Sequence, residues 1–386
     1  MLPYLGVFLA TAGVVVVVTP LVRRLSVRVG AVVQPADRMV HPKPMPTMGG
    51  LAMLVGILSG MGVAATMPAF HGIFTFSEAQ GVLFASLVIA AVGVIDDLRT
   101  LSAPAKVAGQ IVAGGVLALN GVVLVFFYFP TQGTISLGSD LATPLTILWV
   151  LVVVNAVNLV DGLDGLAAGI VVIVAGAFFA YAYNTPSVFA PSASTAPLLC
   201  ALAAGAAAGF LPYNFHPARI IMGDTGSMLL GLLMAAATIS AVGRTTQQVG
   251  SGPNGHDITA FAIPVLLPFL VLLVPMMDVL LAIVRRLWGH RPVYAPDKQH
   301  IHHQLMEIGH SHRQAVLLMY LWSVVAAGAA LAVTFAKTRT TVAAIAGFAV
   351  LVVAVTVVPR VISAVRKARV KTAAEAGPAE RASRSG

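Results

Sequence analysis

Five aspartates are candidates for chemistry because they occupy three short polar motifs in an otherwise apolar chain. The motifs are Asp96-Asp97, Asn-Leu-Val-Asp-Gly-Leu-Asp-Gly at residues 158–165, and Met-Gly-Asp-Thr-Gly-Ser at residues 222–227. Only 14 of the 386 residues are acidic, and a carboxylate at or near hydrocarbon is costly, so five of them in three short motifs call for a functional explanation. Adjacent carboxylates stay ionised best beside a hard cation such as Mg²⁺. The motifs therefore suggest metal-assisted chemistry on an anionic substrate.

Each motif also has an interpretation that needs no catalysis. Asp96 and Asp97 could end a helix in solvent, and Asp224 could cap the helix that follows it. If the second motif is helical, a residue spacing of three puts four polar side chains on one stripe. These are Asn155, Asn158, Asp161 and Asp164. Capping explains one or two of the four, so the stripe is expected to face a cavity or a partner instead of lipid.

A fourth motif contains imidazoles with basic neighbours. His300, His302 and His303 follow Ala-Pro-Asp-Lys-Gln at residues 295–299. Three closely spaced histidines could instead bind zinc. However, no cysteine accompanies them, and the neighbouring Lys and Arg side chains repel a cation. The motif is better suited to a pyrophosphate. Lys106, close after the Asp-Asp pair, could neutralise that pair or hold a phosphate.

The composition places these motifs in a membrane protein. Hydrophobic residues make up 58% of the chain and charged residues 10%, and the mean hydropathy is +0.91. Because about 20 apolar residues span the hydrocarbon as a helix, we predict an all-α polytopic fold with about eleven transmembrane helices. The expected spans are residues 3–20, 48–68, 80–95, 104–120, 142–157, 163–183, 195–212, 223–242, 259–284, 314–336 and 341–359.

Basic residues predict how this bundle is oriented. With the N-terminus outside and the C-terminus cytoplasmic, 20 of the 23 Lys and Arg residues fall on the cytoplasmic side, as the positive-inside rule requires. All four motifs fall on the same side. The net charge of +9 then needs no nucleic acid, because topology and anionic lipid explain it. Cys200 is the single cysteine, so a disulfide within the chain is excluded.

Two further predictions concern organisation. Residues 122–137 carry β-forming residues on both sides of a Pro and Gly turn signal, which predicts a small extracytoplasmic β-hairpin. Residues 1–360 are expected to form a single integral-membrane domain. Residues 361–386 are expected to form a basic, disordered cytoplasmic tail.

The four motifs in this order resemble those of the polyprenyl-phosphate N-acetylhexosamine-1-phosphate transferases, across nearly the whole chain. The His-x-His-His form is similar to the WecA and TagO branch, which uses UDP-N-acetylglucosamine. Three consecutive histidines are typical of the MraY branch, which uses UDP-MurNAc-pentapeptide and is the alternative here. The resemblance implies transfer of N-acetylglucosamine-1-phosphate to undecaprenyl or decaprenyl phosphate, with release of UMP. It also implies a bacterial inner (plasma) membrane enzyme with a cytoplasmic active site, and it leaves a homodimer open.

The resemblance further implies roles for individual residues. Asp96 or Asp97 would activate the lipid phosphate as a base or act as a nucleophile, and Asp161 is the third catalytic candidate. Asp97 and Asp224 would hold Mg²⁺, for which Mn²⁺ could substitute. The residues expected to bind the UDP-sugar and the polyprenyl phosphate are Lys106, Asn158, Asp164, Asn214, Arg219, His300, His302 and His303.

The chain departs from the family pattern at the residue before Met-Gly-Asp. Many relatives have Phe before Met-Gly-Asp, where it can stack on uracil, whereas this chain has Ile221; Phe215 could substitute for it.

A membrane transporter that couples to cations or protons is a different class of protein that would also need carboxylates within the membrane. Its difficulty is that the five aspartates are predicted at cytoplasmic span ends instead of at the midplane. Residues 37–44 with Gly49-Gly50 also resemble the family's first cytoplasmic loop.

Overall fold

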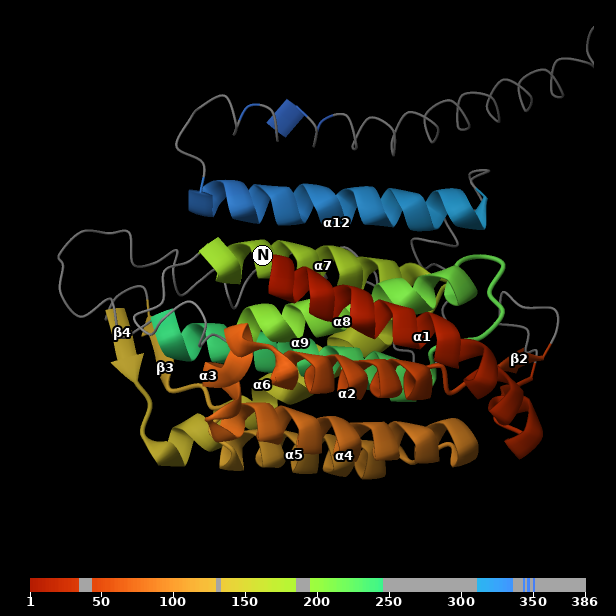
Figure 1. The fold of residues 1–386 in the computed structure, drawn as a ribbon, viewed down its shortest axis with the longest axis horizontal. Coiled ribbons are helices and arrows are strands. Elements are labelled where there is room, and N and C mark those ends of the chain that lie inside the picture. The colour runs from red at the N-terminus through yellow and green to blue at the C-terminus, as the bar shows by residue number, and fades with distance from the viewer. Residues whose placement is uncertain are drawn as a thin grey trace, which may run out of the picture.

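The computed structural model describes residues 1–34, 44–129, 133–184, 195–245 and 311–335, together with four positions between 343 and 350. The long helices of this part lie roughly side by side in one bundle (Figure 1). The helical elements are α1 (Leu2–Val29), α2 (Gly50–Thr66), η1 (Pro68–Phe70), α3 (His71–Phe74), α4 (Ser77–Arg99), α5 (Ala103–Leu119), α6 (Ser139–Val160), α7 (Leu166–Asn184), α8 (Thr195–Asn214), α9 (Gly223–Thr245) and α12 (His312–Phe335).

The apolar helices confirm a helical, polytopic membrane protein. Among the described residues, seven helices are long and apolar enough to cross a membrane, or eight if the bent pair of α2 with Pro68–Phe74 is one span. That pair bends by 97°. α5, with 17 residues, is short for a span. The expected span at 259–284 lies outside the described residues, as does nearly all of 341–359, so the count of eleven stays a prediction.

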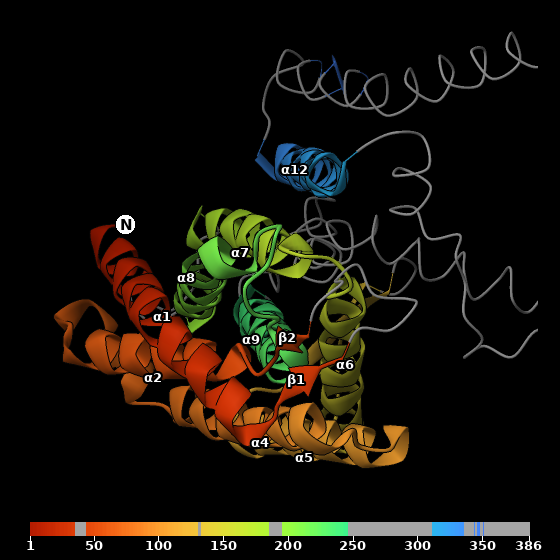
Figure 2. The same cartoon turned by 90° about the vertical axis from the view of Figure 1, so that its right-hand side faces the viewer.

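α9 is the centre of the bundle. It packs against α2, α4, α6, α7 and α8, and Figure 2 shows it enclosed by them. Every residue from 225 to 241 is buried, as expected for a helix that is apolar on all sides. The outer helices instead expose large apolar side chains such as Leu9, Leu21 and Leu148, which suits contact with lipid. α9 is therefore held by protein along its length, and its first turn has a fixed position.

Small residues let the helices around the start of α9 approach closely. A Cβ added at Gly50 of α2 would collide with the backbone of Thr225 and Gly226, and one added at Gly93 of α4 would also meet Thr225. Such close backbone approach through glycine is common between membrane helices. α2, α4 and α9 thus meet tightly at one end of the bundle.

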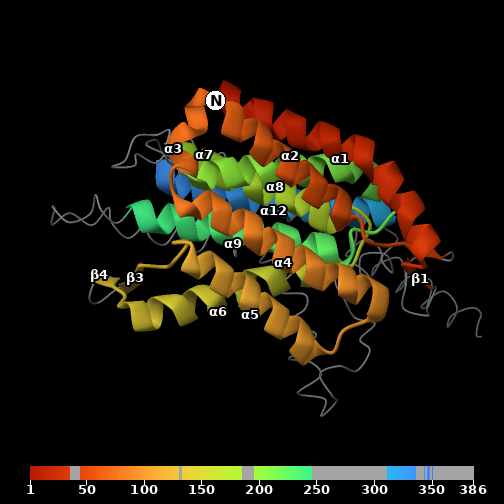
Figure 3. The ribbon, with the colours of Figure 1, turned by 60° about the horizontal axis from the view of Figure 1, so that its bottom comes forward.

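Two pairs of short strands mark the opposite ends of the bundle (Figure 1, Figure 3). β1 (Val32–Val33) pairs antiparallel with β2 (Met45–Pro46) between α1 and α2. At the other end, β3 (Phe126–Phe129) pairs antiparallel with β4 (Gly133–Ser136), with Phe126 opposite Ser136. These strands lie within residues 122–137, where the sequence predicts a hairpin.

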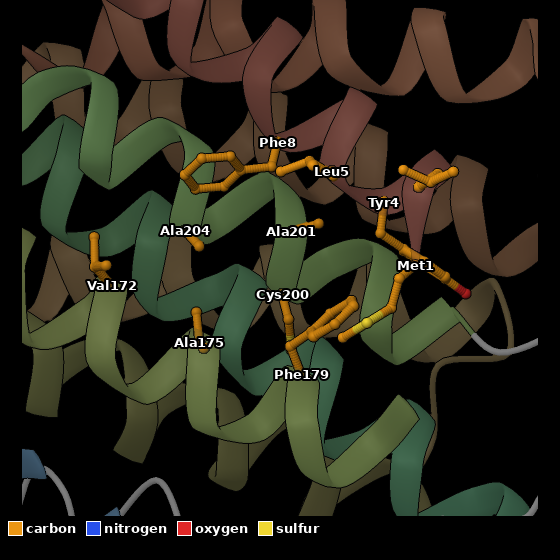
Figure 4. A pocket seen from close by; sticks show the side chains of 12 residues that line it. Met1, Tyr4, Leu5, Phe8, Val172, Ala175, Phe179, Cys200, Ala201 and Ala204 are labelled. Carbon is orange, nitrogen blue, oxygen red and sulfur yellow. The ribbon is translucent and has the colours of Figure 1, made fainter. Parts of the chain in front are cut away.

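An apolar groove lies in the half of the bundle that contains β3 and β4. It has a volume of about 410 Å³ and lies between α1, α7 and α8. Figure 4 shows side chains from these helices around it, among them Tyr4, Phe8, Val172 and Phe179. None of the predicted site residues that the structure describes lines this groove.

Candidate active site

Asp97, near the end of α4, caps the start of α9. Its Oδ1 accepts hydrogen bonds from the Asp224 amide at 3.0 Å and the Thr47 hydroxyl at 3.2 Å. Its Oδ2 accepts from the Thr225 hydroxyl at 2.6 Å and the Thr225 amide at 3.3 Å. The first amides of a helix have no partner within the helix, and a negative charge beside them is stabilising. Asp97 therefore fixes the first turn of α9, and with it Asp224, against α4.

Gly223 makes this cap sterically feasible. It has a φ of 71°, which belongs to the left-handed region that favours glycine. A Cβ at this position would overlap both carboxylate oxygens of Asp97 and the hydroxyl oxygen of Thr47. The glycine before Asp224 in the third motif is thus required by the approach of a carboxylate.

Asp96 lies beside Asp97 in the sequence but has different partners. Its Oδ1 accepts from the Leu101 amide at 2.6 Å, and its Oδ2 lies 3.3 Å from Lys106 Nζ. The same ammonium group also contacts Asp224 Oδ2. One positive charge from α5 therefore bridges carboxylates from α4 and α9. The three side chains are partly exposed, at 15 to 23%, so this group remains accessible.

Two members of the predicted stripe, Asn155 and Asn158, lie on α6 and face α5 and α9, whereas Asp161 and Asp164 follow the helix in a loop because α6 ends at Val160. Asn158 Nδ2 donates to Asp224 Oδ1 at 2.8 Å and to Ser227 Oγ at 2.8 Å. One turn further from the bundle end, Asn155 Nδ2 donates to Gln110 Oε1 at 2.7 Å. Both amides of the predicted stripe thus contact neighbouring helices. Asn158 completes a set of polar groups around Asp224 that comes from α4, α5, α6 and α9.

Asp161 follows the last residue of α6 and is half-buried. Burial raises the pKa of Asp161 from 3.8 to about 8, with additional contributions from the charges of Asp97 and Asp164. Desolvation and like charges both disfavour the ionised form. In the absence of a cation, this carboxyl group is therefore mostly protonated at neutral pH.

A second polar cluster lies at the same end of the bundle. Asp164 Oδ2 lies 2.8 Å from His216 Nδ1 and accepts from the Ala218 amide at 3.1 Å. The imidazole of His216 stacks on that of His312 in the first turn of α12, with centroids 4.2 Å apart and planes inclined by 26°. We call Asp164, His216 and His312 the imidazole cluster. Sequence analysis missed both histidines; the position of His216 two residues after Asn214 was the available signal.

Asn214 joins the loops that carry the two clusters. It is 2% exposed; its Oδ1 accepts from the Gly165 amide at 3.0 Å, and its Nδ2 donates to the Ile220 carbonyl at 3.1 Å. Arg219 contributes its carbonyl, which accepts from Arg23 Nε at 3.0 Å, while the residue itself is exposed. Asn214 therefore lies near the predicted pocket, with its amide used to hold the backbone.

The other residues singled out in the sequence either lie beside these clusters or fall outside the described residues. Phe215 lies against Gly165, about 3.0 Å from the position of an added Cβ. The carbonyl of Ile221 accepts from the Gly49 amide at 3.1 Å. His300, His302 and His303 lie outside the described residues, as does most of the early loop at 37–44.

Comparison with known proteins places this arrangement in a family. Residues 79–242 match the family model described as glycosyl transferase family 4, and this range contains all five aspartates. Over 348 residues the chain is 42% identical to the decaprenyl-phosphate N-acetylglucosaminephosphotransferase of Mycobacterium tuberculosis, covering 88% of this chain and 84% of that protein. The chain belongs to glycosyl transferase family 4.

Other members of family 4 refine the comparison. The chain is 34% identical over 315 residues to a probable undecaprenyl-phosphate N-acetylglucosaminyl 1-phosphate transferase of Bacillus subtilis, over 81% of this chain and 80% of that protein. It is 30% identical over 227 residues to a phospho-N-acetylmuramoyl-pentapeptide-transferase of Mycobacterium avium, over 51% of this chain and 63% of that protein. The resemblance to the polyprenyl-phosphate transferases is confirmed, and the muramoyl-pentapeptide relatives are more distant.

Proposed function

We propose that the protein transfers N-acetylglucosamine-1-phosphate from UDP-N-acetylglucosamine to a polyprenyl phosphate, giving polyprenyl-pyrophosphoryl-N-acetylglucosamine and UMP. The observation that carries this proposal is the convergence of Asp96, Lys106, Asn158 and Asp224 on one bundle end in a member of this family. Relatives named for this reaction match more than four-fifths of the chain, and those named for the pentapeptide reaction match about half. The 42% identical relative is named for decaprenyl phosphate, which favours that acceptor.

The proposed reaction is an attack of the lipid phosphate on the sugar-bearing phosphorus of the donor. A new P–O bond forms there, the bond from that phosphorus to the bridging oxygen breaks, and the oxygen leaves with UMP. We assign Asp96 the role of accepting a proton from the lipid phosphate, because both Asp97 oxygens already receive two hydrogen bonds each. Lys106 would stabilise negative charge on the phosphates.

The donor set fits Mg²⁺. Carboxylate oxygens are the hard ligands that Mg²⁺ prefers, and Asp96 and Asp224 already converge on the single ammonium of Lys106. The predicted ligand pair is Asp97 and Asp224. Asp97 lies beside Asp224 because its carboxylate caps the first turn of α9, which keeps this pair together and leaves Asp96 as the proposed proton acceptor. When bound, the ion would neutralise the pyrophosphate and charge on the departing UMP. The same ligands suit Mn²⁺.

We propose that this bundle end faces the cytoplasm of a bacterial cell whose inner (plasma) membrane contains the protein. The distribution of Lys and Arg supports this orientation, and β3–β4 at the opposite bundle end would then be extracytoplasmic. A transporter fits less well because the aspartates gather at one end of the bundle instead of its middle. A homodimer remains a prediction.

The direct test uses purified protein with UDP-N-acetylglucosamine labelled in the sugar, decaprenyl phosphate and Mg²⁺. We expect a labelled lipid and one UMP per lipid formed, and no product after chelation of the metal by EDTA. UDP-MurNAc-pentapeptide should give no lipid product under the same conditions. Lipid product from UDP-MurNAc-pentapeptide, with none from UDP-N-acetylglucosamine, would assign the protein to the MraY branch. Ion flux in vesicles without any lipid product would favour a transporter.

A further inference from the structure

The imidazole cluster contains two histidines to which the roles above assign nothing. It joins three elements far apart in the sequence: the loop after α6, the loop before α9 and the first turn of α12. Asp164 is nearly fully buried, with 4% of its side chain exposed, whereas 30% of the His216 side chain is exposed. A buried carboxylate behind a more accessible imidazole is the usual arrangement of a functional histidine whose orientation is fixed from behind.

We propose that His216 contacts the nucleotide donor through its Nε2 edge, and that Asp164 and His312 are positioning residues that orient its ring. This inference rests on the proposed function, because it assigns a subsite to the same UDP-sugar. It also changes the predicted role of Asp164 from direct binding of the substrate to holding His216. The ligand chemistry is that of a hydrogen-bonding group of a nucleoside diphosphate.

The bonding around His216 supports this assignment. With Nδ1–H donated to Asp164 at 2.8 Å, the ring cannot turn over without losing that bond, so Nε2 stays on the other side of the ring. The flat face is supported by His312. The backbone is held as well, because the His216 carbonyl accepts from Arg313 Nε at 2.9 Å. Ring and backbone of this residue are thus both fixed.

α12 is anchored to the same region by a second contact. Tyr320 Oη, two turns after His312, donates to the carbonyl of Gly165, and its ring occupies space that a side chain at Gly169 would fill. α12 also packs along α7 (Figure 2). The stacking partner of His216 therefore comes from a helix with a defined position, which a positioning role requires.

A metal ion is the competing occupant of the cluster. One ligand atom from each of the three residues lies within 4.8 Å of the others. However, the lone pair of an imidazole nitrogen lies in the ring plane, and rings stacked 4.2 Å apart and within 26° of parallel keep theirs in separate, nearly parallel planes that do not converge on one ion. The geometry thus favours an oriented histidine over a chelating pair.

The test compares two substitutions at His216 that separate its two edges. His216→Asn keeps an N–H close to the Nδ1 position and hence the bond to Asp164, but it removes the Nε2 edge. We expect the KM for UDP-N-acetylglucosamine to rise about five- to tenfold, the value of one lost hydrogen bond. The kcat and the KM for decaprenyl phosphate should change less than twofold. His216→Gln, whose amide reaches the Nε2 position, should recover part of the loss.

A double-mutant cycle tests the positioning role of Asp164. His216→Phe keeps the stacking and removes both nitrogen edges. If Asp164 acts through His216, Asp164→Asn should raise the donor KM in the wild-type background and add little to His216→Phe. His71→Asn, on α3 at the other bundle end, is the matched control and should have no effect. Thermal unfolding of each variant separates misfolding from weakened binding.

Several results would overturn the inference. An unchanged donor KM in His216→Asn would do so, as would additive effects of Asp164→Asn and His216→Phe. Calorimetry with Zn²⁺ alone provides another test, because stoichiometric binding that His216→Asn abolishes would make the cluster a metal site. If the wild-type protein forms no lipid product, the proposed function fails first; calorimetric titration of UDP into wild type and His216→Asn then still tests the subsite.

Discussion

The two ends of the bundle differ in the helices that form their sites and in the groups that these sites offer a ligand. At one end, Asp97 finds free amides at the start of α9, and Asp96 and Asp224 share an ammonium group. Toward the other end, α1, α7 and α8 enclose an apolar groove of about 410 Å³. Helix termini leave backbone groups without partners inside the helix, so they can hold charge at a membrane edge. The groups able to do chemistry therefore lie where helix termini and charged side chains meet, and not where the cavity volume is.

The largest contrast is expected between aspartates at opposite ends. Asp224→Asn removes a carboxylate that contacts Lys106 and Asn158 and is a proposed metal ligand, so turnover should fall about a thousandfold or more. Asp140→Asn, in the first turn of α6 at the other end, is the matched control. Initial rates of lipid product formation measure both. Equal activity of the two variants would remove the distinction between the ends.

A smaller difference in activity is expected between alanine substitutions at Gly223 and Gly121, two glycines with similar backbone conformation. Both have positive φ, at 71° and 88°, so alanine should cost roughly 1–2 kcal/mol of conformational strain at either position. At Gly121 the nearest atom to an added Cβ is Ser77 Oγ at 3.6 Å, whereas at Gly223 the Cβ would displace the Asp97 carboxylate. Thermal unfolding should shift further in Gly223→Ala than in Gly121→Ala, because the displaced Asp97 carboxylate also loses hydrogen bonds to the first turn of α9. Activity should fall tenfold or more only in Gly223→Ala, and equal activities would contradict the role assigned to Asp97.

A third contrast is a pH dependence of stability that comes from Asp161. Its pKa is raised from 3.8 to about 8 in the folded protein, so the folded state holds a proton that the unfolded state releases. This contribution to stability is complete below pH 4 and is lost as the pH rises to about 8. The thermal midpoint of the wild type without Mg²⁺ should therefore decline more steeply over this range than that of Asp161→Asn. Mg²⁺ should reduce the difference at pH 8; parallel profiles of the two proteins would contradict the shift.

Much of the site could be predicted from sequence because its residues lie in compact motifs. Asp96, Lys106, Asn158 and Asp224 were all expected at one membrane face, and four helices bring them together. The division of labour between Asp96 and Asp97 could not be predicted, since it depends on how the first turn of α9 sits against the end of α4. Two adjacent aspartates look equivalent until the position of those amides is known.

Two features could not be predicted from sequence patterns: the contact between the two histidines of the imidazole cluster, and the bend after α2. His216 and His312 are distant in the sequence and have no regular spacing, so only the packing of α12 beside the loop before α9 brings them together. Long apolar runs located the described helices well, because the hydrocarbon demands long apolar segments. They could not predict that the chain bends by 97° between α2 and Pro68–Phe74, at the end of the second expected span, since both arms of the bend are apolar.

The polar end of the bundle is proposed to catalyse transfer of a sugar phosphate and not of a sugar alone. These two reactions can be separated by supplying UDP-N-acetylglucosamine labelled with ³²P at the sugar-bearing phosphorus, together with decaprenyl phosphate and Mg²⁺. We expect the label to enter the lipid in an amount equal to that of the sugar, and unlabelled UMP to be released. Label released in UDP, with sugar alone on the lipid, would contradict this proposal.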